Sequence, residues 1–583
     1  MLKTLTMQIK EFKRDVIVTP ICMILEVIFE TVIPFLMASI IDHGVEAGNI
    51  QHIYKVGGWM AASAACGLLC GILGGRFSSR AATGYARNLR EAMFENIQSF
   101  SFSNIDKYST AGLVTRLTTD VTNIQNALQM LLRMCFRAPF SMICAMAMAF
   151  VINARLAAIY LGAVLILGVL LFGIVTSAMK YFQQAFPKYD DMNASVQENV
   201  SAIRVVKAYV REDHETKKFK RASQNIYDIF MKAEYKVIWN MPLLQITVYT
   251  CILLISWIGA KMIVGHALTT GELMSLLTYC MNILMNLMML SMVFVMLTMS
   301  VASVRRVVEV LEEKSDLSNP ENPVFQVEDG GIRFENVDFA YQKASGEPVL
   351  RGINLEIRAG ETIGVIGGTG SAKTSLVNLI SRLYDVTAGR VLVGGRDVRE
   401  YDMETLRNQV AVVLQKNVLF SGTILENLRW GKEDADEEEC RQACRLACAD
   451  EFIEKMPDGY HTYIEQGGAN VSGGQKQRLC IARALLKQPK ILILDDSTSA
   501  VDTATDSKIR QAFAQEIPGT TKIIIAQRIS SVESADRILV MDNGRVDGFG
   551  THEELLRENE IYREVYESQK SGGGDFDEKA GES

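Results

Sequence analysis

The sequence has no excess of positive charge. Its 60 Lys and Arg residues are outnumbered by 67 Asp and Glu residues, and the net charge is −7. A protein whose main partner is DNA or RNA carries a basic surface that neutralises phosphates. The charge balance therefore gives no support to nucleic acid as a partner.

A disulfide framework is also missing. The chain has 11 cysteines in 583 residues, and they are scattered rather than paired at regular spacings. Cys440, Cys444 and Cys448 would share one helical face, which makes a metal site the alternative interpretation. No histidine or fourth cysteine lies beside them at zinc-ligand spacing. We therefore expect buried, reduced thiols.

No clear small-residue cleavage site follows the basic N-terminus. Lysine and arginine residues precede an apolar run, as they do in a signal peptide. The run from residue 16 to residue 41 is too long for a signal core. We expect it to remain in the protein as a membrane span.

Apolar sequence is what the chain has in abundance. Hydrophobic residues make up 49% of it and the mean hydropathy is +0.12, which is higher than a soluble protein of this length needs. Six apolar segments reach or approach the roughly 20 residues that cross a bilayer as a helix. They are residues 16–41, 56–75, 136–152, 156–178, 243–264 and 273–300.

The connections between these segments alternate between short and long. The short ones are nearly free of Lys and Arg, whereas residues 76–133 and 180–236 are long, charged and patterned like helices. Because cytoplasmic connections carry the excess of Lys and Arg, both long connections and both termini are expected in the cytoplasm. The third and fourth spans should form a helical hairpin with a very short external turn at residues 153–155.

The character of the chain changes after residue 300. A charged helix is followed by a linker that contains Pro320 and Pro323, and then by short β-rich runs that alternate with helical stretches. This alternation is typical of an α/β domain with a mainly parallel sheet. The strands are expected at residues 332–339, 362–366, 409–414, 491–495 and 522–526.

A phosphate-binding loop lies between the second of these strands and a helical stretch at residues 375–384. In this context backbone N–H groups cradle phosphates. Lys373 would neutralise the outer phosphates and Thr374 would bind Mg²⁺. Ala372 replaces the usual last glycine, which is tolerable where the local backbone is helical. The expected ATP-binding residues of this loop are Gly367, Gly368, Thr369, Gly370, Ser371, Ala372, Lys373, Thr374 and Ser375.

Two further motifs make the assignment of the loop more specific. A buried strand ends in Asp495, whose carboxylate can reach the metal, and a second Gly-rich turn opens a helix at residues 476–486. The turn consists of Ser472, Gly473, Gly474 and Gln475 after a valine. With these motifs in this order, the chain resembles the ATP-binding-cassette (ABC) transporter family over nearly its whole length, and within it the half-transporter exporters of the multidrug and lipid type.

The predicted fold is a membrane domain of six transmembrane helices with long cytoplasmic extensions, fused to an α/β P-loop NTPase nucleotide-binding domain. The Gly-rich, acidic end of the chain is expected to be disordered. The expected boundaries are a cytoplasmic segment at 1–15, a transmembrane domain at 16–312, a linker at 313–330, a nucleotide-binding domain at 331–570 and a tail at 571–583.

The resemblance implies roles for residues outside the phosphate loop. Tyr341 matches the aromatic residue that stacks on adenine, and Gln415 matches a glutamine of the Mg²⁺ shell. Glu465 lies in the segment that touches the coupling helices of the partner. Residues 499–502, ending in Asp502, match the loop across the cassette dimer interface. The second Gly-rich turn is the family signature, which contacts the ATP held by the opposite cassette.

Two positions depart from the family pattern. Asp496 stands where a glutamate usually polarises the attacking water, and Gln527 stands where a histidine usually lies near the γ-phosphate. Aspartate is one methylene shorter, so its carboxylate is retracted by roughly 1 Å, and misplacement on that scale can reduce a rate about a hundredfold. We expect a weakened ATP site in a heterodimer whose other half-transporter has the intact Glu and His. A slow homodimer is the alternative.

The resemblance also implies the activity, which is ATP-driven export of hydrophobic or amphipathic compounds, as in multidrug efflux, by alternating access across the bacterial cytoplasmic membrane. ATP and Mg²⁺ are the expected cofactors. Residues 102–117 and 210–219 resemble coupling segments, where short helices dock on the cassettes. The alternatives are a lipid or lipopeptide flippase and, in a different class, a non-transporting ATP-gated regulator or channel.

Candidate cargo contacts lie in the first and sixth spans. Glu26 and Glu30 are one helical turn apart, and carboxylates are costly to place in a membrane, so they could hold a cationic drug. Asn282, Met285 and Met289 could line a cavity, because flexible thioethers adapt to varied apolar ligands. Ordinary helix packing is the alternative for all of these residues.

Overall fold

The computed structural model describes residues 2–341, 346–496 and 501–570. The predicted tail at 571–583 and two residues of the predicted interface loop, Ser499 and Ala500, lie outside the described residues.

The chain divides into two compact units. One unit consists of Met1–Ser99 and Tyr108–Glu313, and the other of Phe100–Lys107 and Lys314–Ser583. The segment Phe100–Lys107 lies within the first unit in sequence but packs with the second.

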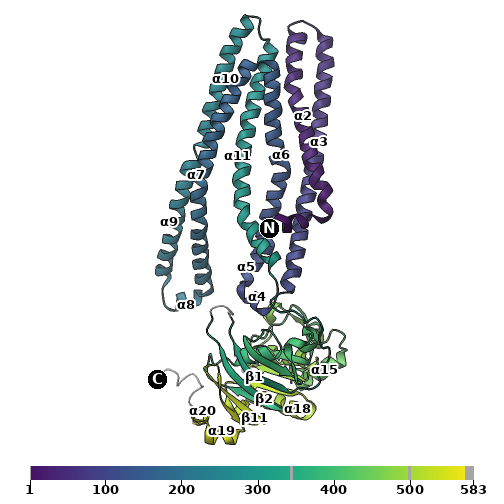
Figure 1. Ribbon diagram of the computed structural model, residues 1–583, viewed down its shortest axis with the longest axis vertical. Coiled ribbons are helices and arrows are strands. Elements are labelled where there is room, and N and C mark those ends of the chain that lie inside the picture. The colour runs from purple at the N-terminus through teal and green to yellow at the C-terminus, as the bar shows by residue number, and fades with distance from the viewer. Residues whose placement is uncertain (1, 342–345, 497–500, 571–583) are drawn as a thin grey trace. The chain divides into compact units, whose positions relative to one another are not determined.

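Six helices of the first unit are long and apolar enough to cross a membrane, within the part of the chain that the structure describes. The prediction of six spans is confirmed. A helix satisfies its own backbone hydrogen bonds, which a bilayer requires because it offers no partners for them. The six helices run side by side (Figure 1). They are α2 (Lys13–Ile40), α3 (Ile50–Gln98), α6 (Val121–Ile152), α7 (Ala154–Ser201), α10 (Asn240–Val264) and α11 (Thr270–Glu312).

Several of these helices are much longer than a membrane is thick. The 49 residues of α3 span about 74 Å at ~1.5 Å per residue, whereas the hydrocarbon layer is ~30 Å thick. The long connections therefore continue the spans as rigid extensions. The shorter elements of this unit are α1 (Leu2–Met7), η1 (Lys10–Phe12), η2 (Ile41–Val45), α5 (Thr110–Thr115), η3 (Arg116–Asp120), α8 (Ile203–Ala208) and α9 (Glu212–Val237).

The second long connection is a helical hairpin. Helix α9 returns along α7, and α8 forms the tip between them (Figure 1). The sequence placed the short coupling helix at residues 210–219, but most of that range is the start of α9. The break falls at Val210, whose φ of +51° cannot continue a right-handed helix.

The predicted external turn between the third and fourth spans is present. Helix α6 ends at Ile152, and Asn153 has extended backbone angles. Its side-chain oxygen accepts hydrogen bonds from the N–H groups of Arg155 at 3.1 Å and Leu156 at 3.2 Å. Asparagine is a favoured N-cap because it satisfies the first free N–H groups of a helix. One residue is thus enough to reverse the chain.

A buried carboxylate at the end of η3, directly before α6, ties this part of the chain to α11. Asp120 is only 1% exposed. It accepts hydrogen bonds from Ser303 Oγ at 2.8 Å and from Arg306 Nε at 2.7 Å. The charge is acceptable in this position because both oxygens have donors.

The second unit is built on a six-stranded sheet with the order β12-β11-β3-β10-β9-β6. All neighbours are parallel except β11 and β12, so the prediction of a mainly parallel sheet is confirmed. The carboxyl ends of the central parallel strands meet at one edge, where ligands bind in such sheets. The strands are β3 (Thr362–Ile366), β6 (Val410–Val413), β9 (Ile491–Asp495), β10 (Thr521–Ile525), β11 (Arg537–Asp542) and β12 (Arg545–Gly550).

A separate antiparallel sheet is formed by strands that precede and follow β3 in the sequence. Its order is β2-β1-β4-β5, and the first predicted strand belongs to it. A two-stranded pair, β7 (Gly422–Thr423) and β8 (Tyr463–Ile464), lies elsewhere. The strands of the antiparallel sheet are β1 (Ile332–Phe339), β2 (Leu350–Ile357), β4 (Ala388–Val393) and β5 (Arg396–Asp397).

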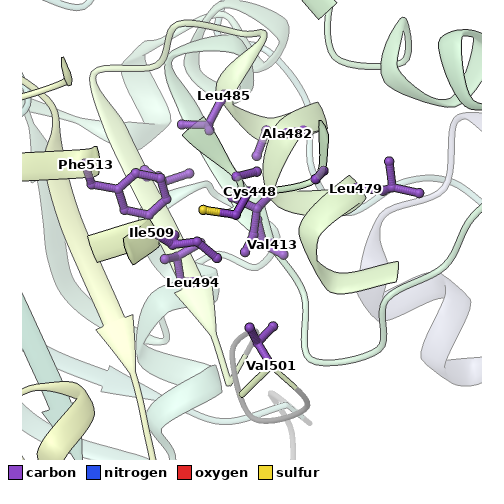
Figure 2. Close-up of a cluster of buried hydrophobic side chains, with 14 of the residues drawn as sticks. Val413, Cys448, Leu479, Ala482, Leu485, Leu494, Val501, Ile509 and Phe513 are labelled. Carbon is purple, nitrogen blue, oxygen red and sulfur yellow. The ribbon is translucent and has the colours of Figure 1, made fainter. Parts of the chain in front are cut away.

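Helices pack on the parallel sheet and enclose a hydrophobic core. Figure 2 shows Cys448 among apolar side chains of the sheet and of two helices, including Leu494 and Phe513. Burial raises the pKa of the nearby Cys444 thiol to about 12, and a metal needs the thiolate. No cluster of metal-ligating residues is found in the described part of the chain. The main helices of this unit are α12 (Lys373–Ile380), α13 (Met403–Gln409), α14 (Ile424–Leu428), α15 (Glu437–Leu446), α16 (Asp450–Ile453), α17 (Gly473–Leu485), α18 (Thr503–Glu516), α19 (His552–Glu558) and α20 (Glu560–Lys570).

We expect Asp120→Ala to destabilise the membrane unit by about 2 kcal/mol, because Ser303 and Arg306 lose a shared charged acceptor. Thermal unfolding of the full chain in detergent measures the effect. The matched control is Asp191→Ala, since that carboxylate is 67% exposed and pairs with Lys188 at the surface, where ion pairs contribute ~0–1 kcal/mol. Equal shifts in the two variants would contradict a structural role for Asp120.

Candidate functional site

The phosphate loop joins β3 to α12 at the carboxyl edge of the parallel sheet. Helix α12 begins at Lys373, before the predicted residue 375, and ends at Ile380 because Arg382 adopts a φ of +50°. Gly367 has a φ of +156°, and a Cβ there would lie 2.2 Å from the carbonyl oxygen of Met541. Only glycine allows this approach of β11 to the loop.

The side chain of Lys373 folds back over the loop. Its Nζ donates hydrogen bonds to the carbonyl oxygens of Gly367 at 2.7 Å and Gly368 at 2.8 Å, and it lies 3.3 Å from Ser371 Oγ. The ammonium group is therefore held at the concave face of the loop. A positive charge beside the start of a helix suits an anionic ligand such as a phosphate.

A cavity of about 390 Å³ opens over the loop. This volume lies within the range of small-molecule sites, roughly 300–1,000 Å³. Residues that are far apart in sequence meet in its wall, and they include both positions that depart from the family pattern. The wall consists of Val349, Thr369, Gly370, Ser371, Ala372, Lys373, Thr374, Ser375, Gln415, Asp495, Asp496, Ile525 and Gln527.

Asp495 is the buried carboxylate of the cavity. It ends β9, is 3% exposed, and accepts a hydrogen bond from Thr374 Oγ1 at 2.9 Å. Burial raises the pKa of Asp495, and the neighbouring Asp496 raises it further, against the effects of Thr374 and Lys373. Carboxylate and hydroxyl oxygens are the ligands that Mg²⁺ prefers. The oxygens of Asp495 and Thr374 therefore fit a Mg²⁺ ion bound together with phosphates.

Asp496 and Gln527 contact each other directly. Gln527 Nε2 donates a hydrogen bond to Asp496 Oδ2 at 3.2 Å. Asp496 has a φ of +47°, and its N–H donates to the carbonyl oxygen of Ile525 at 3.1 Å. The left-handed backbone of Asp496 is held between two neighbouring strands. Asp496 is the only acidic side chain besides Asp495 in the described cavity wall. One of its two carboxylate oxygens therefore accepts a hydrogen bond from the amide of Gln527.

Tyr341 lies beside the phosphate loop and is 44% exposed. Its hydroxyl is 2.8 Å from Ser375 Oγ, and its ring meets the edges of Phe339 and Tyr384 with centroids 4.8 Å and 5.2 Å away. The ring is therefore fixed by aromatic neighbours and by α12. An exposed, fixed aromatic ring can stack on a base.

Sequence reasoning missed the neighbour Tyr384. Its hydroxyl donates a hydrogen bond to Asp106 Oδ2 at 2.6 Å, and its ring lies edge-on to Phe102 with centroids 6.0 Å apart. Both partners belong to α4 (Phe102–Lys107), inside the predicted coupling segment at 102–117. Burial raises the pKa of Tyr384 and Asp106 adds to the shift. No periodicity or motif links residues so distant in sequence.

The second Gly-rich turn starts α17. Ser472 Oγ accepts a hydrogen bond from the N–H of Gln475 at 3.3 Å, and Gln475 Oε1 accepts one from the N–H of Ser472 at 2.9 Å. This reciprocal capping fixes the turn. Of the described residues 472–475, none lies in the wall of the 390 Å³ cavity. The turn and the cavity are separate surfaces of one chain.

Glu465 and Asp502, the two residues predicted to lie at the interface with a partner, are exposed and directly precede helical elements. Glu465 precedes a short turn, and its N–H donates to Asn470 Oδ1 at 3.0 Å. Asp502 caps α18 by accepting from the N–H of Thr505 at 3.0 Å, which lowers the pKa of Asp502. Both carboxylates are at the surface, and their contact with a partner stays a prediction.

The backbone at Ala372 differs from the expectation. A helical conformation was the condition for tolerating a methyl group there, but Ala372 has φ +72° and ψ +25°, which is left-handed. An L-residue other than glycine pays roughly 1–2 kcal/mol for this conformation. The expectation of a helical backbone at Ala372 was wrong, because this residue lies just before the helix, where the loop turns.

The candidate cargo residues of the membrane unit lie on α2 and α11. Glu26 and Glu30 both face Arg137 of α6, with Arg137 Nη2 at 3.6 Å from Glu26 Oε1 and 2.8 Å from Glu30 Oε2. Sequence reasoning missed this arginine as their partner. Met285 is 57% exposed, whereas Asn282 and Met289 are partly buried.

Two family models match the chain. The model described as the ABC transporter transmembrane region matches residues 16–301, and the model described as ABC transporter matches residues 350–499. The first match falls mainly in the first unit of the fold, and the second match falls in the second unit.

Curated proteins match over nearly the full length. The chain is 36% identical to the uncharacterized ABC transporter ATP-binding protein YfiB of Bacillus subtilis (strain 168), over 94% of this chain and 95% of YfiB. It is 34% identical to an ATP-dependent lipid A-core flippase of Desulfotalea psychrophila, over 83% of this chain and 84% of the flippase. Among solved structures, a bacterial Atm1-family ABC exporter with ATP bound matches with a TM-score of 0.83 and 25% identity, over 96% of this chain and 99% of that chain.

We expect Ala372→Gly to stabilise the second unit by roughly 0.5–1 kcal/mol, because glycine adopts a left-handed backbone without the steric cost. Thermal unfolding of the full chain measures the effect. The matched control is Ala504→Gly in α18, which should destabilise by up to ~1 kcal/mol as glycine does in a helix. Destabilisation by both substitutions would show that Ala372 is not strained.

Proposed function

The chain belongs to the ABC transporters, as an exporter half-transporter with a transmembrane region and an ATP-binding domain, and we propose that it is the weakened subunit of a heterodimeric exporter. ABC half-transporters pair to form the complete machine, and their ATP hydrolysis drives transport. The proposal concerns which of the two ATP sites is active and what the partner supplies.

The contact between Asp496 and Gln527 carries the proposal. A general base must reach the water that attacks the γ-phosphate. The side chain of Asp496 is one methylene shorter than that of glutamate, so its carboxylate is about 1 Å farther from this water. The hydrogen bond from Gln527 holds its Oδ2 inside the site. An amide has no titratable proton near neutral pH, so Gln527 cannot take the place of a histidine in proton transfer.

The rest of the site favours binding of ATP. Lys373 lies at the concave face of the phosphate loop, and Tyr341 presents a fixed ring for the adenine. Thr374, Asp495 and Gln415 would hold Mg²⁺, which supplies charge neutralisation for the phosphates. A subunit that binds ATP tightly and hydrolyses it slowly would keep the dimer closed while the partner site turns over.

The signature turn supports the dimer. Ser472 caps the start of α17 by accepting a hydrogen bond from the N–H of Gln475, and helix starts attract phosphates. Because this turn is not part of the chain's own cavity, it would act on ATP held by the partner. A homodimer would contain two weakened sites, whereas a partner with intact Glu and His would form one full site here.

Exposed apolar residues at the tip of the second hairpin fit docking on the partner. Ile203 is 44% exposed, Val205 56% and Tyr209 74%. Large exposed apolar groups that gather in one place mark interaction sites. We assign this tip, with α8, as the coupling element that contacts the cassette of the partner subunit. The proposed location is the bacterial cytoplasmic membrane, with the cassette and both termini in the cytoplasm.

Multidrug-type export is the first proposed activity, and lipid flipping is the second. Two relatives, at 34% and 31% identity, are named ATP-dependent lipid A-core flippase. A flippase would show ATPase activity that responds to lipid, whereas a drug exporter would respond to soluble amphipathic compounds.

The ATPase activity should depend on the partner. We expect low activity from the chain alone and high activity when it is purified with a half-transporter that has the intact Glu and His. Neutralising the catalytic glutamate of the partner should reduce the activity of the pair to a low residual rate, because the full site is the one that holds this glutamate. Brisk turnover by this chain alone would contradict the heterodimer and make Asp496 a working base.

Replacing Asp496 and Gln527 by the residues usual in the family should restore ATP hydrolysis at this chain's own site. In the pair with the partner's glutamate neutralised, we expect the double substitution Asp496→Glu and Gln527→His to raise the residual ATPase rate about a hundredfold. The control is Asp536→Glu, a similar one-methylene extension outside the cavity wall, which should leave the rate unchanged. No gain from the double substitution would locate the weakness elsewhere.

A further inference from the structure

Four ionisable side chains lie close together in sequence on α2 and α6. Glu26, Glu30 and Arg137 lie within the apolar stretches, and Arg133 lies one turn before Arg137, at the end of the charged connection that precedes the third span. Ionisable residues inside a membrane are costly and usually serve function. The paired carboxylates alone suggested a site for a cationic drug. The structure adds two guanidinium groups, so the balance of charge decides which cargo fits.

One arginine serves both carboxylates. Arg137 contacts one oxygen of each, Glu26 Oε1 and Glu30 Oε2. The second oxygen of each carboxylate has no hydrogen-bond partner among the described residues. These three side chains therefore carry one excess negative charge. They are between 22% and 48% exposed, so a ligand can reach them from outside the helices.

Arg133 is the counterpart with an unpaired positive charge. It lies one turn before Arg137 on the same face of α6, because residues four apart on a helix are neighbours at roughly 5–6 Å between Cβ atoms. Arg133 makes no ion pair within the described part of the chain, and its Nε is buried without a hydrogen-bond partner. Burying such a donor unsatisfied costs roughly 1–3 kcal/mol. The Nε of Arg137 is also buried without a partner.

The polar face of α6 continues for another turn. Ser141 follows Arg137 by four residues, and Ser141 Oγ accepts a hydrogen bond from Asn286 Nδ2 of α11 at 3.1 Å. On α11, Met285 directly precedes Asn286 and is 57% exposed. The polar strip thus continues to α11, where a flexible thioether next to Asn286 in the sequence can contact the apolar part of an amphiphile.

We propose that this strip binds a zwitterionic amphiphile, with its anionic group on Arg133 and its ammonium group on Glu26 and Glu30. The four side chains together have no net charge. The unpaired positive charge of Arg133 lies one helical turn from Arg137, where the two carboxylates leave one excess negative charge. A purely cationic or purely anionic head group would satisfy one end and leave net charge in the membrane, which is costly. A head group with a phosphate and a primary ammonium, such as phosphatidylethanolamine, satisfies both ends.

The proposal deepens the exporter function, since the bound amphiphile is its cargo. Lipid binding is measured on the full chain in detergent without nucleotide, so it is independent of the partner and of the ATP sites. Failure of the heterodimer would leave the binding result intact, and failure of binding would leave the ATPase of the pair intact.

The experiment compares three lipids with identical acyl chains by native mass spectrometry. They are phosphatidylethanolamine, the anionic phosphatidylglycerol and a cationic trimethylammonium lipid. We expect phosphatidylethanolamine to bind about tenfold more tightly than either single-charge lipid, as one additional charge-assisted hydrogen bond would give.

Substitutions at Arg133 and at the two carboxylates should change the affinities for the three lipids differently. Arg133→Gln should weaken phosphatidylethanolamine about tenfold and leave the cationic lipid unchanged. The double substitution Glu26→Gln and Glu30→Gln should weaken phosphatidylethanolamine and the cationic lipid but not phosphatidylglycerol. Arg155→Gln, at the exposed external turn, is the matched control and should change nothing.

Three outcomes would overturn the proposal. Equal binding of phosphatidylethanolamine and phosphatidylglycerol, both weakened by Arg133→Gln, would make this an anion site only. Tightest binding of the cationic lipid, insensitive to Arg133→Gln, would make it a cation site. Phosphatidylethanolamine that binds the wild-type chain and the Arg133→Gln chain equally tightly would show that this lipid binds elsewhere.

Discussion

A bilayer core provides no water to hydrogen-bond a peptide group, and this constraint shapes the first half of the molecule. Every crossing segment has to satisfy its own backbone, so the six spans are helices. Polar side chains inside this layer must find partners among themselves. Glu26 and Glu30 therefore share Arg137, and Ser141 pairs with Asn286. Once a helix has formed it is stiff, and α3 and α7 continue it well past the apolar segments.

The ATP-binding unit depends on a second constraint, the meeting of parallel strands at one edge of a sheet. The ends of β3 and β9 bring the phosphate loop beside Asp495. Strand β10 lies between these two strands and leads to Gln527. This convergence builds one wall of an ATP site. The second Gly-rich turn opens α17 outside the wall of this cavity. The phosphate loop and this turn are therefore available to different ligands or surfaces.

Within the second unit, a series of contacts leads from α4 to the phosphate loop. Asp106 and Phe102 touch Tyr384, whose ring touches Tyr341. Tyr341 in turn contacts Ser375 at the start of α12. Packed aromatic rings resist small displacements because protein interiors are close-packed. A movement of α4 would therefore be felt at the residue assigned to the adenine, and occupation of that residue would be felt at α4.

The sequence by itself determined the features that depend on local pattern. Apolar length predicted the six spans, and alternation of short apolar runs predicted the parallel sheet. The short turn at residues 153–155 and the order of the phosphate loop, Asp495 and the second Gly-rich turn could also be recognised from neighbouring residues alone. These predictions hold because helix formation, membrane crossing and tight turns are decided within a few residues of the chain.

The tertiary structure decided what depends on distant partners. Glu30 and Arg137 are 107 residues apart, and Asp106 and Tyr384 are 278 residues apart, so no spacing could pair them. The left-handed backbone of Ala372 follows from the turn between β3 and α12, where β11 approaches Gly367. The balance of charge around the two carboxylates changed for the same reason. Glu26 and Glu30 looked like an isolated acidic pair, and packing of α2 against α6 placed Arg137 in contact with both of them.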